Sequence, residues 1–250
     1  MRSSAVTLRR SALAGLLLLP SLALAGERVS YTVAGQAYEG YYAAPARGAP
    51  LVLLVHDWDG LTDYEIKRVG MLVELGYAVF AADLFGAGVR PTTLDDKRQH
   101  TGELYRDRKK MRALLQAALD AAQQQGADVG RAVAMGYCFG GAAVLELARS
   151  GAALKGFASF HGGLGRPTDQ NYAQVKAPIL VMHGSADRNI SMQDFATLAT
   201  ELEQAGVAHE MITYSGAPHA FTVFGGAAYT ESADQASWSR FTQFLQQRLR

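Results

Sequence analysis

The sequence predicts an α/β protein with a mostly parallel sheet that is flanked by helices on both faces. Segments of strand length are apolar throughout, amphipathic segments of helical length separate them, and glycine follows several of the helical segments. A strand that is apolar on both sides has to be covered on both sides, and alternation of such strands with helices is typical of parallel sheets. We therefore expect a single domain over residues 26–250, beginning with a β-hairpin.

The composition is that of a globular protein with a sizeable core. Of the 250 residues, 49% are hydrophobic and 19% are charged, and the formal net charge is +1. So small a charge does not provide the broad basic surface that nucleic-acid binding requires. Cys138 is the only cysteine, which excludes an internal disulfide and a metal site built from several cysteines.

The first 25 residues have the pattern of a secretory signal peptide. Residues 1–10 contain three arginines and no acid, residues 13–19 are apolar, and the segment ends in Ala23-Leu24-Ala25. This order predicts cleavage before Gly26. The apolar run is shorter than the ~20 residues of a membrane span. We expect a periplasmic or secreted bacterial protein with no membrane partner after cleavage, exported by the general or the twin-arginine pathway.

Hydrophobic periodicity predicts the elements of the domain. Alternation with period two around Gly35 predicts the hairpin, and continuous apolar runs predict buried strands. The spacing of Ile66, Val69 and Val73 predicts a helix. Ligands of such sheets bind at the carboxyl ends of the strands. The expected strands are 29–33, 37–43, 51–55, 77–82, 132–136, 154–160, 178–182 and 210–214, and the expected helices are 62–75, 95–125, 140–149, 191–205 and 232–249.

Cys138 lies in an expected strand-to-helix turn, between Gly136 and Gly140. This pattern matches the G-x-S-x-G nucleophile elbow, with sulfur in place of oxygen. Such a turn strains its central residue, and crowding between strand and helix leaves no room for side chains two residues before and after it. The thiol would lie at a helix N-terminus, which favours a thiolate, and the N–H of Phe139 would face a developing oxyanion. A buried structural cysteine is the alternative interpretation.

Asp187 and His219 each follow a different expected strand. The order nucleophile, acid, histidine is that of hydrolases with a nucleophile elbow. His219 would accept the thiol proton, and Asp187 would orient the imidazole. Taken singly, Asp187 could instead cap the next helix and His219 could be a surface histidine, but their common order with Cys138 favours a triad.

The chain resembles the dienelactone hydrolase family of α/β-hydrolases over residues 28–248. The resemblance implies the α/β-hydrolase fold without a large cap domain, and it places Cys138, Asp187 and His219 on the triad of the family. By the same resemblance, Trp58 would supply a second N–H to the oxyanion hole. The matching stretches are 55–61, 82–85, 136–141, 183–187 and 216–221.

Two features depart from the pattern of the family. The family usually has a glutamate after the first parallel strand, which modulates the nucleophile, and Asp57 takes that position here. Members that cleave dienelactone also have arginines that bind the substrate carboxylate, and the corresponding positions hold Ala87 and Val223. The resemblance thus implies a thiol-modulating role for Asp57, but dienelactone itself is not the expected substrate.

The sequence therefore predicts a cofactor-free cysteine hydrolase that cleaves a small ester, lactone or related carbonyl compound through an acyl-cysteine. The substrate would be a small molecule, and the protein would be a monomer or a simple homo-oligomer. Trp58, Phe139 and Phe221 are candidates for substrate contacts, with core packing as the alternative. A non-catalytic ligand-binding protein on the same fold is a second hypothesis. A thiol redox protein is a third, although the chain lacks a resolving cysteine.

Three histidines, His56, His161 and His183, lie at the ends of expected strands. Three imidazoles can bind zinc. No helix-borne histidine pair accompanies them, and histidines at strand ends often bond to nearby loops. We therefore expect no metal site.

Overall fold

The structure is a computed structural model that describes residues 26–250. The expected signal peptide, residues 1–25, lies outside the described residues. Within the described range, no helix is both long enough and apolar enough to cross a membrane.

An eight-stranded sheet forms the centre of the described chain, in the order β1-β2-β4-β3-β5-β6-β7-β8. β1 and β2 form an antiparallel hairpin and β2 pairs antiparallel with β4, whereas the pairings from β4 onward are parallel. This confirms the expected mostly parallel sheet with an N-terminal hairpin. The strands are β1 (Glu27–Val33), β2 (Gln36–Ala43), β3 (Pro50–Val55), β4 (Ala78–Ala82), β5 (Asp128–Tyr137), β6 (Gly156–Phe160), β7 (Ile179–Gly184) and β8 (His209–Tyr214).

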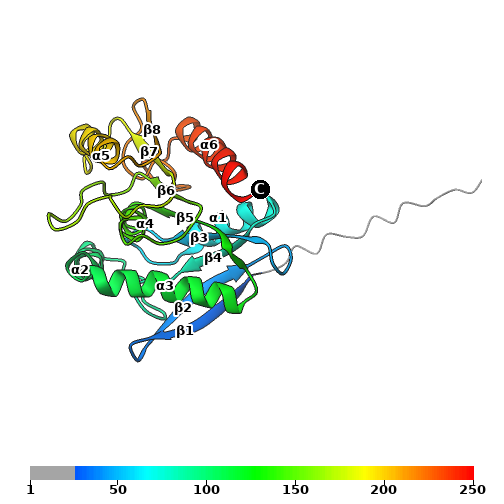
Figure 1. Ribbon diagram of the computed structural model, residues 1–250. Helices are drawn as coiled ribbons and strands as arrows, with labels where there is room; N and C mark the ends of the chain where they lie inside the picture. Colours follow the sequence, from blue (N-terminus) through cyan, green and yellow to red (C-terminus); the bar gives the residue numbers. More distant parts are fainter. Residues whose placement is uncertain (1–25) are drawn as a thin grey trace, which may run out of the picture.

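Helices cover both faces of this sheet (Figure 1). On one face, α2, α4 and α5 contribute Leu104, Leu145 and Leu198 to a hydrophobic cluster that α3 also joins. On the other face, α1 and α6 contribute Leu72 and Phe241 to a second cluster. The helices are α1 (Asp63–Glu74), α2 (Leu94–Arg106), α3 (Arg108–Gln124), α4 (Phe139–Arg149), α5 (Met192–Gln204) and α6 (Glu231–Leu249).

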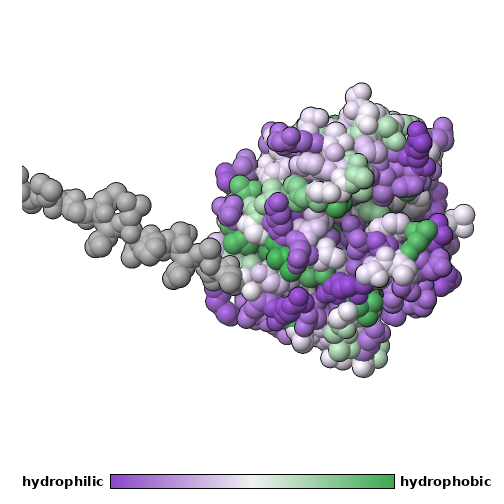
Figure 2. Space-filling view, turned by 180° about the vertical axis from the view of Figure 1, so that it is seen from behind, coloured by the Kyte–Doolittle hydropathy of each residue, from purple (hydrophilic) through white to green (hydrophobic). Residues whose placement is uncertain are grey.

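The central strands are closed to solvent because both helical layers cover them. Residues 51–55 of β3 are all 0% exposed, which explains why their sequence is apolar without alternation. On the face drawn in Figure 2, apolar residues occur in small groups among polar ones. Two of the large hydrophobic side chains that do reach the surface, Trp58 and Tyr105, lie in the region of the site described below.

The structure differs from the expectation of one helix over residues 95–125. This segment forms two helices, α2 and α3, which meet at Asp107. Asp107 has φ −110° and ψ 79°, which is not helical, and its side chain accepts a hydrogen bond from the N–H of Lys110 at 2.9 Å. This carboxylate caps α3, so the chain turns although the apolar periodicity continues. The break brings the ring of Tyr105 to 5.5 Å from that of Phe139, beside the candidate nucleophile.

Four strands direct the candidate residues to one edge of the sheet. β3 ends before Asp57, β5 ends directly before Cys138, and β7 and β8 end before Asp187 and His219. Because these strands are parallel, their carboxyl ends lie at the same edge. The fold thus brings together side chains that are 32 and 81 residues apart in the sequence.

Candidate active site

Cys138 occupies the turn between β5 and α4 with φ 51° and ψ −111°, a conformation that L-residues rarely adopt. A Cβ atom on Gly136 would lie 2.3 Å from the carbonyl carbon of Gly140, and one on Gly140 would lie 2.2 Å from the carbonyl oxygen of Val55. Only glycine fits at these two positions, so strand and helix approach closely enough to hold the turn. The sulfur is thereby presented at the N-terminus of α4, where the helix dipole favours negative charge.

The imidazole of His219 lies between Cys138 and Asp187. Its Nε2 is 3.1 Å from Sγ of Cys138, and its Nδ1 is 2.7 Å from Oδ2 of Asp187. An ionised carboxylate only accepts hydrogen bonds, so Nδ1 carries a proton and donates it. Oδ1 of Asp187 accepts the N–H groups of Asn189 and Ile190 at 2.8 and 2.9 Å, which fixes the carboxylate. This geometry allows a proton to pass between the thiol and the imidazole.

Opposing effects set the charges of this group of residues. Burial disfavours the imidazolium, but the hydrogen bonds to Asp187 and Cys138 outweigh burial and raise the pKa of His219 to about 10. Burial also opposes ionisation of Asp187, but the hydrogen bonds from His219 and the backbone outweigh it and hold the pKa of this carboxyl below its usual value. The surroundings therefore favour a proton on His219 and a negative charge on Asp187.

A buried hydrogen-bond network supports the loop that carries His219. The hydroxyl of Thr222, three residues further on, lies 2.8 Å from Nε2 of His161 and 2.7 Å from the hydroxyl of Tyr64. The guanidinium of Arg68 donates to the carbonyl oxygen of Thr222 at 2.9 Å. The loop is thus tied to α1 and to the end of β6, which limits the positions that the imidazole can take.

The backbone N–H groups of Phe139 and Trp58 lie at the carboxyl ends of two neighbouring strands, β5 and β3. Phe139 is the first residue of α4, so its N–H has no acceptor within the helix. Val55 pairs with Gly136 across neighbouring strands, which places the turn after β3 beside the elbow. Trp58 lies in that turn, and its N–H donates no hydrogen bond within the described residues.

The turn that carries Trp58 encloses two buried carboxyl groups, those of Asp57 and Glu65. Oε2 of Glu65 accepts the N–H and the hydroxyl of Thr62, both at 2.8 Å, and Oε1 lies 3.5 Å from the N of Asp57. Oδ1 of Asp57 accepts the N–H of Asp59 at 2.8 Å. Burial raises the pKa of Glu65 to about 8 and that of Asp57 to about 6. Burial therefore favours the neutral form of both carboxyl groups.

Asp57 does not reach the nucleophile directly. Within the described residues its carboxylate hydrogen-bonds to its own turn, and no hydrogen bond joins it to Cys138. An influence of Asp57 on the thiol would therefore act through space or through the turn of Trp58. Sequence reasoning compared Asp57 with the glutamate of the family, and it did not identify Glu65 as the second carboxyl group of this turn.

The three aromatic candidates for substrate contacts occupy different environments. Trp58 is 36% exposed, but Phe139 and Phe221 are 2% and 0% exposed. The ring of Phe221 packs against that of His161 at 5.3 Å, inside the loop of His219. The burial of Phe139 and Phe221 favours core packing, the alternative interpretation of these two side chains. Burial of the Phe139 ring does not bear on its backbone N–H.

The three buried histidines, His56, His161 and His183, each hydrogen-bond to a different partner. Nε2 of His56 accepts the N–H of Leu84 at 3.1 Å, and Nε2 of His183 lies 3.2 Å from the carbonyl oxygen of Ile190. His161 bonds to Thr222, as described above. Within residues 26–250, no three His, Cys, Asp or Glu side chains are grouped as metal ligands.

Sequence reasoning missed Glu65, Thr222 and Tyr105 as parts of this region. Thr62 and Glu65 form a capping box at the start of α1, and the T-x-x-E spacing is a signal that could have identified Glu65. Thr222 and Tyr105 have no such local signal. They reach the site only because a loop folds back and because α2 ends at Asp107.

The sheet, the cysteine elbow and the later acid and histidine define the class of the protein as an α/β-hydrolase. Within this class, residues 38–249 match the model of the dienelactone hydrolase family. The chain belongs to this family, as its resemblance predicts.

Similar proteins agree with this assignment. Carboxymethylenebutenolidase of Pseudomonas putida is 27% identical over 223 residues, covering 84% of this chain and 93% of that protein. Protein usf of Aquifex pyrophilus is 25% identical over 201 residues, covering 78% of this chain and 87% of that protein. A dienelactone hydrolase-like promiscuous phosphotriesterase from metagenomic libraries has a TM-score of 0.83 and 28% identity, covering 91% of this chain and 99% of its own. An acylaminoacyl peptidase of Pyrococcus horikoshii has a TM-score of 0.71 and 15% identity, covering 90% of this chain and 42% of its own. At this identity, the similarity shows a common fold only.

Proposed function

We propose that this protein is a cofactor-independent hydrolase that cleaves a small carboxylic ester or lactone through an acyl-cysteine on Cys138. The observation that carries the proposal is the imidazole of His219, with Nε2 3.1 Å from the sulfur and Nδ1 2.7 Å from Asp187. Membership of the dienelactone hydrolase family, and similarity to a carboxymethylenebutenolidase, support an ester or lactone as the bond attacked.

Acylation of Cys138 is the first half of the proposed reaction. With the proton of the thiol already held on Nε2 of His219, as the raised pKa of this imidazole favours, the sulfur adds to the carbonyl carbon of the substrate. The oxygen takes the electron pair of the C=O bond, and the N–H groups of Phe139 and Trp58 stabilise this oxyanion. When the carbonyl re-forms, the bond to the alcohol oxygen breaks and Nε2 gives its proton to that oxygen. The acyl group remains on the sulfur as a thioester.

Hydrolysis of the thioester completes the cycle. Nε2 of His219 takes a proton from water as the water oxygen adds to the acyl carbon. The C–S bond then breaks, the carboxylic acid leaves and the sulfur recovers a proton from Nε2. Asp187 holds Nδ1 protonated throughout, and it stabilises the imidazolium without taking up the proton itself.

Intact-protein mass spectrometry with 4-nitrophenyl acetate tests the nucleophile and the reaction class together. We expect a burst of nitrophenolate and an acetyl mass on the peptide that contains Cys138. The acetyl mass should be absent from Cys138→Ala, and nitrophenolate release should fall at least about 10³-fold in Cys138→Ala and His219→Ala. His209→Ala is the matched control, because His209 bonds to the carbonyl of Val207, away from the triad. Hydrolysis at the parental rate by Cys138→Ala would overturn the proposal.

A non-catalytic binding protein is the second candidate, and the absence of the family arginines at Ala87 and Val223 favours it. The two candidates differ in the reactivity of the thiol. A hydrolase should react with iodoacetamide faster than free cysteine does, because Nε2 of His219 lies 3.1 Å from the sulfur and is positioned to take its proton. A rate no higher than that of free cysteine, with no turnover of any ester in a panel, would favour the binding protein.

We also propose that residues 1–25 direct export and are then removed. The basic, apolar and small-residue segments of this range support the proposal. Protein recovered from the periplasm of a bacterial host should begin at Gly26 when its N-terminus is sequenced. An intact Met1 in that fraction would contradict cleavage.

A further inference from the structure

The helix α2 contacts both segments that carry the proposed oxyanion donors. Near its start, Nζ of Lys97 lies 5.1 Å from the centre of the Trp58 ring. Near its end, the centre of the Tyr105 ring lies 5.5 Å from that of Phe139. Positions 97, 101 and 105 are spaced by four, so they lie along one face of the helix. This face of α2 is therefore directed at the turn after β3 and at the elbow of Cys138.

The ammonium of Lys97 binds the turn of Trp58 at two points. Nζ lies 2.6 Å from Oδ1 of Asp59, the residue after Trp58, and it also lies over the indole ring. This oxygen of Asp59 is buried and accepts no hydrogen bond from elsewhere in residues 26–250. A cation at this distance from the face of an indole is attracted by the ring. Lys97 therefore holds the carboxylate of one residue and the ring of its neighbour.

The middle of this turn contains a residue that does not fix the backbone by itself. Gly60, directly after Asp59, has φ 83°, a conformation that glycine adopts readily but leaves as readily. The carboxylate of Glu65 hydrogen-bonds at residues 57 and 62, which are the two ends of the turn. The ion pair with α2 holds the middle instead, where the N–H of Trp58 lies.

The position of Lys97 is fixed by the helix that carries it. The hydroxyl of Thr101 donates to the carbonyl oxygen of Lys97 at 2.8 Å, and the ring of His100 lies 5.2 Å from that of Phe85. Leu104, two turns after Lys97, is buried in the core cluster of this face of the sheet. The side chain of Lys97 is itself only 17% exposed. Water and salt therefore screen this ion pair less than they screen a fully exposed one.

We propose that Lys97 is a positioning residue for the hydrolysis, because its contacts with Asp59 and the Trp58 ring hold the N–H of Trp58 toward the oxyanion. This inference rests on the proposed function and adds to it a residue outside the triad. The ammonium is paired with Asp59 and takes no part in the proton transfers. Its effect reaches the reaction through the turn alone.

The kinetics of Lys97→Met test the inference. The substitution removes the ammonium but keeps an unbranched side chain that suits a helix. With 4-nitrophenyl acetate we expect kcat to fall about fivefold and KM to change less than about twofold, because a displaced donor weakens a contact made in the transition state. Lys97→Arg keeps a cation for both partners and should restore most of the kcat. Lys109→Met, at an exposed position of α3, is the control.

Counting active sites separates positioning from a purely structural role. The burst of nitrophenolate gives the fraction of active protein, so kcat can be expressed per active site. A structural role would lower the burst amplitude of Lys97→Met and leave kcat per active site at the parental value. That result would overturn the inference.

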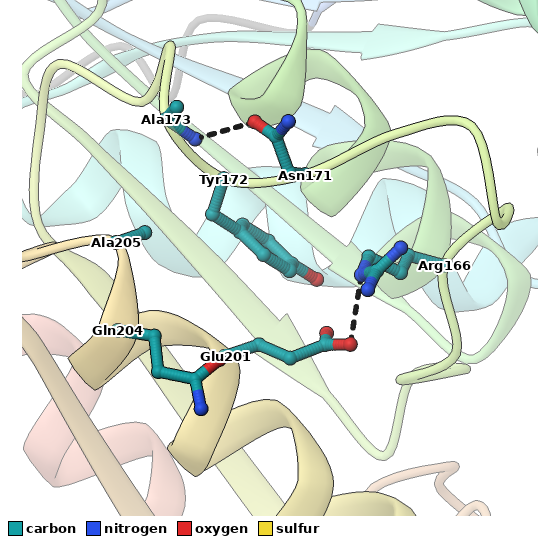
Figure 3. Close-up of a pocket in the computed structure, with 7 residues that line it drawn as sticks. All are labelled: Arg166, Asn171, Tyr172, Ala173, Glu201, Gln204 and Ala205. Carbon is teal, nitrogen blue, oxygen red and sulfur yellow. Dashed lines mark hydrogen bonds and ion pairs between the residues drawn. The ribbon is translucent and has the colours of Figure 1, made fainter.

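The ion pair itself is tested by combining Lys97→Met with Asp59→Ala. Each single variant breaks the same contact, so the double variant should lose no more kcat than either one. Losses that multiply would overturn the inference, and so would a kcat that rises in Asp59→Ala. The matched control is the ion pair of Glu201 with Arg166, drawn in Figure 3, which has a length of 2.7 Å and joins α5 to the loop after β6. Glu201→Ala should leave kcat unchanged.

The fluorescence of Trp58 separates this inference from the proposed hydrolase activity. Trp58 and Trp238 are the two tryptophans of the chain, so Trp238→Phe leaves the emission of Trp58 alone. In this background, Lys97→Met should shift the emission to the red and increase quenching by acrylamide, because the indole loses the cation over its ring. Unchanged spectra and unchanged kcat, in a protein that hydrolyses 4-nitrophenyl acetate, would overturn the inference alone.

A parent protein that hydrolyses no ester gives a different result. The proposed function then fails whatever the spectra show, and the role of Lys97 in hydrolysis fails with it. Changed spectra in such a protein would still show that Lys97 holds the turn of Trp58.

Discussion

The carboxylate of Glu65 is bonded to both ends of the turn that carries Trp58. One oxygen accepts the N–H and hydroxyl of Thr62 at 2.8 Å, and the other lies 3.5 Å from the N of Asp57. Glu65 is 0% exposed, so no water replaces these contacts. A side chain on α1 thereby holds the turn from which the N–H of Trp58 would reach an oxyanion.

Replacing Glu65 should therefore affect both stability and catalysis. Glu65→Ala leaves partly buried groups of Thr62 without an acceptor, which costs about 1 kcal/mol of unfolding free energy. The kcat should fall more than KM changes, because an oxyanion contact acts in the transition state. Glu65→Gln keeps an acceptor oxygen, so it should retain most of the free energy of unfolding and most of the kcat of the parent. Urea unfolding and ester kinetics measure the two effects, and Glu74→Ala, at the exposed end of α1, is the control.

The contribution of Asp57 and Glu65 to the free energy of unfolding should fall as pH rises from about 5 to about 8. The raised pKa values of Asp57, about 6, and Glu65, about 8, mean that the folded state holds protons that the unfolded state has already released. Their contribution is present below the ordinary carboxyl pKa and is lost as pH rises through the raised values. The slope is at most about 1.4 kcal/mol per pH unit for one group. Glu65→Gln cannot ionise there, so the free energy of unfolding of the parent relative to this variant should fall as pH rises. A difference that does not change with pH in urea unfolding would contradict this account.

Asp187→Asn should lower kcat/KM by roughly 10²-fold or more, because an amide does not hold Nδ1 of His219 as a reliable donor. The pKa of His219 should fall in the same variant, because the hydrogen bond from His219 to Asp187 is a main cause of its rise. NMR titration of the imidazole measures this pKa independently of catalysis. Asp128→Asn, an exposed partner of Arg131, should change neither quantity.

Thr222→Val should destabilise the loop of His219 by about 1–3 kcal/mol. The substitution keeps the shape of the side chain but removes the hydroxyl that bonds to His161 and Tyr64. Because the imidazole is then less firmly placed, kcat should fall as well. Thr200→Val is the control, since the hydroxyl of Thr200 bonds only within α5, to Ala196. Equal unfolding free energies of the two variants would argue against the network.

Some features of this protein, namely the order of its elements and the elbow of Cys138, can be predicted from local sequence patterns. The order of strands and helices is visible because apolar runs and helical spacing are local, and the glycines at 136 and 140 mark the elbow of Cys138 because only they fit there. Asp187 and His219 could be placed at the same sheet edge because parallel strands align their carboxyl ends.

Tertiary structure decided what depends on contacts between distant segments. The burial of Phe221 and the contacts of Thr222 with His161 and Tyr64 each follow from packing that leaves no periodic trace. The sequence by itself therefore determined the sheet and the order of the candidate triad, whereas packing between segments determined what surrounds that triad.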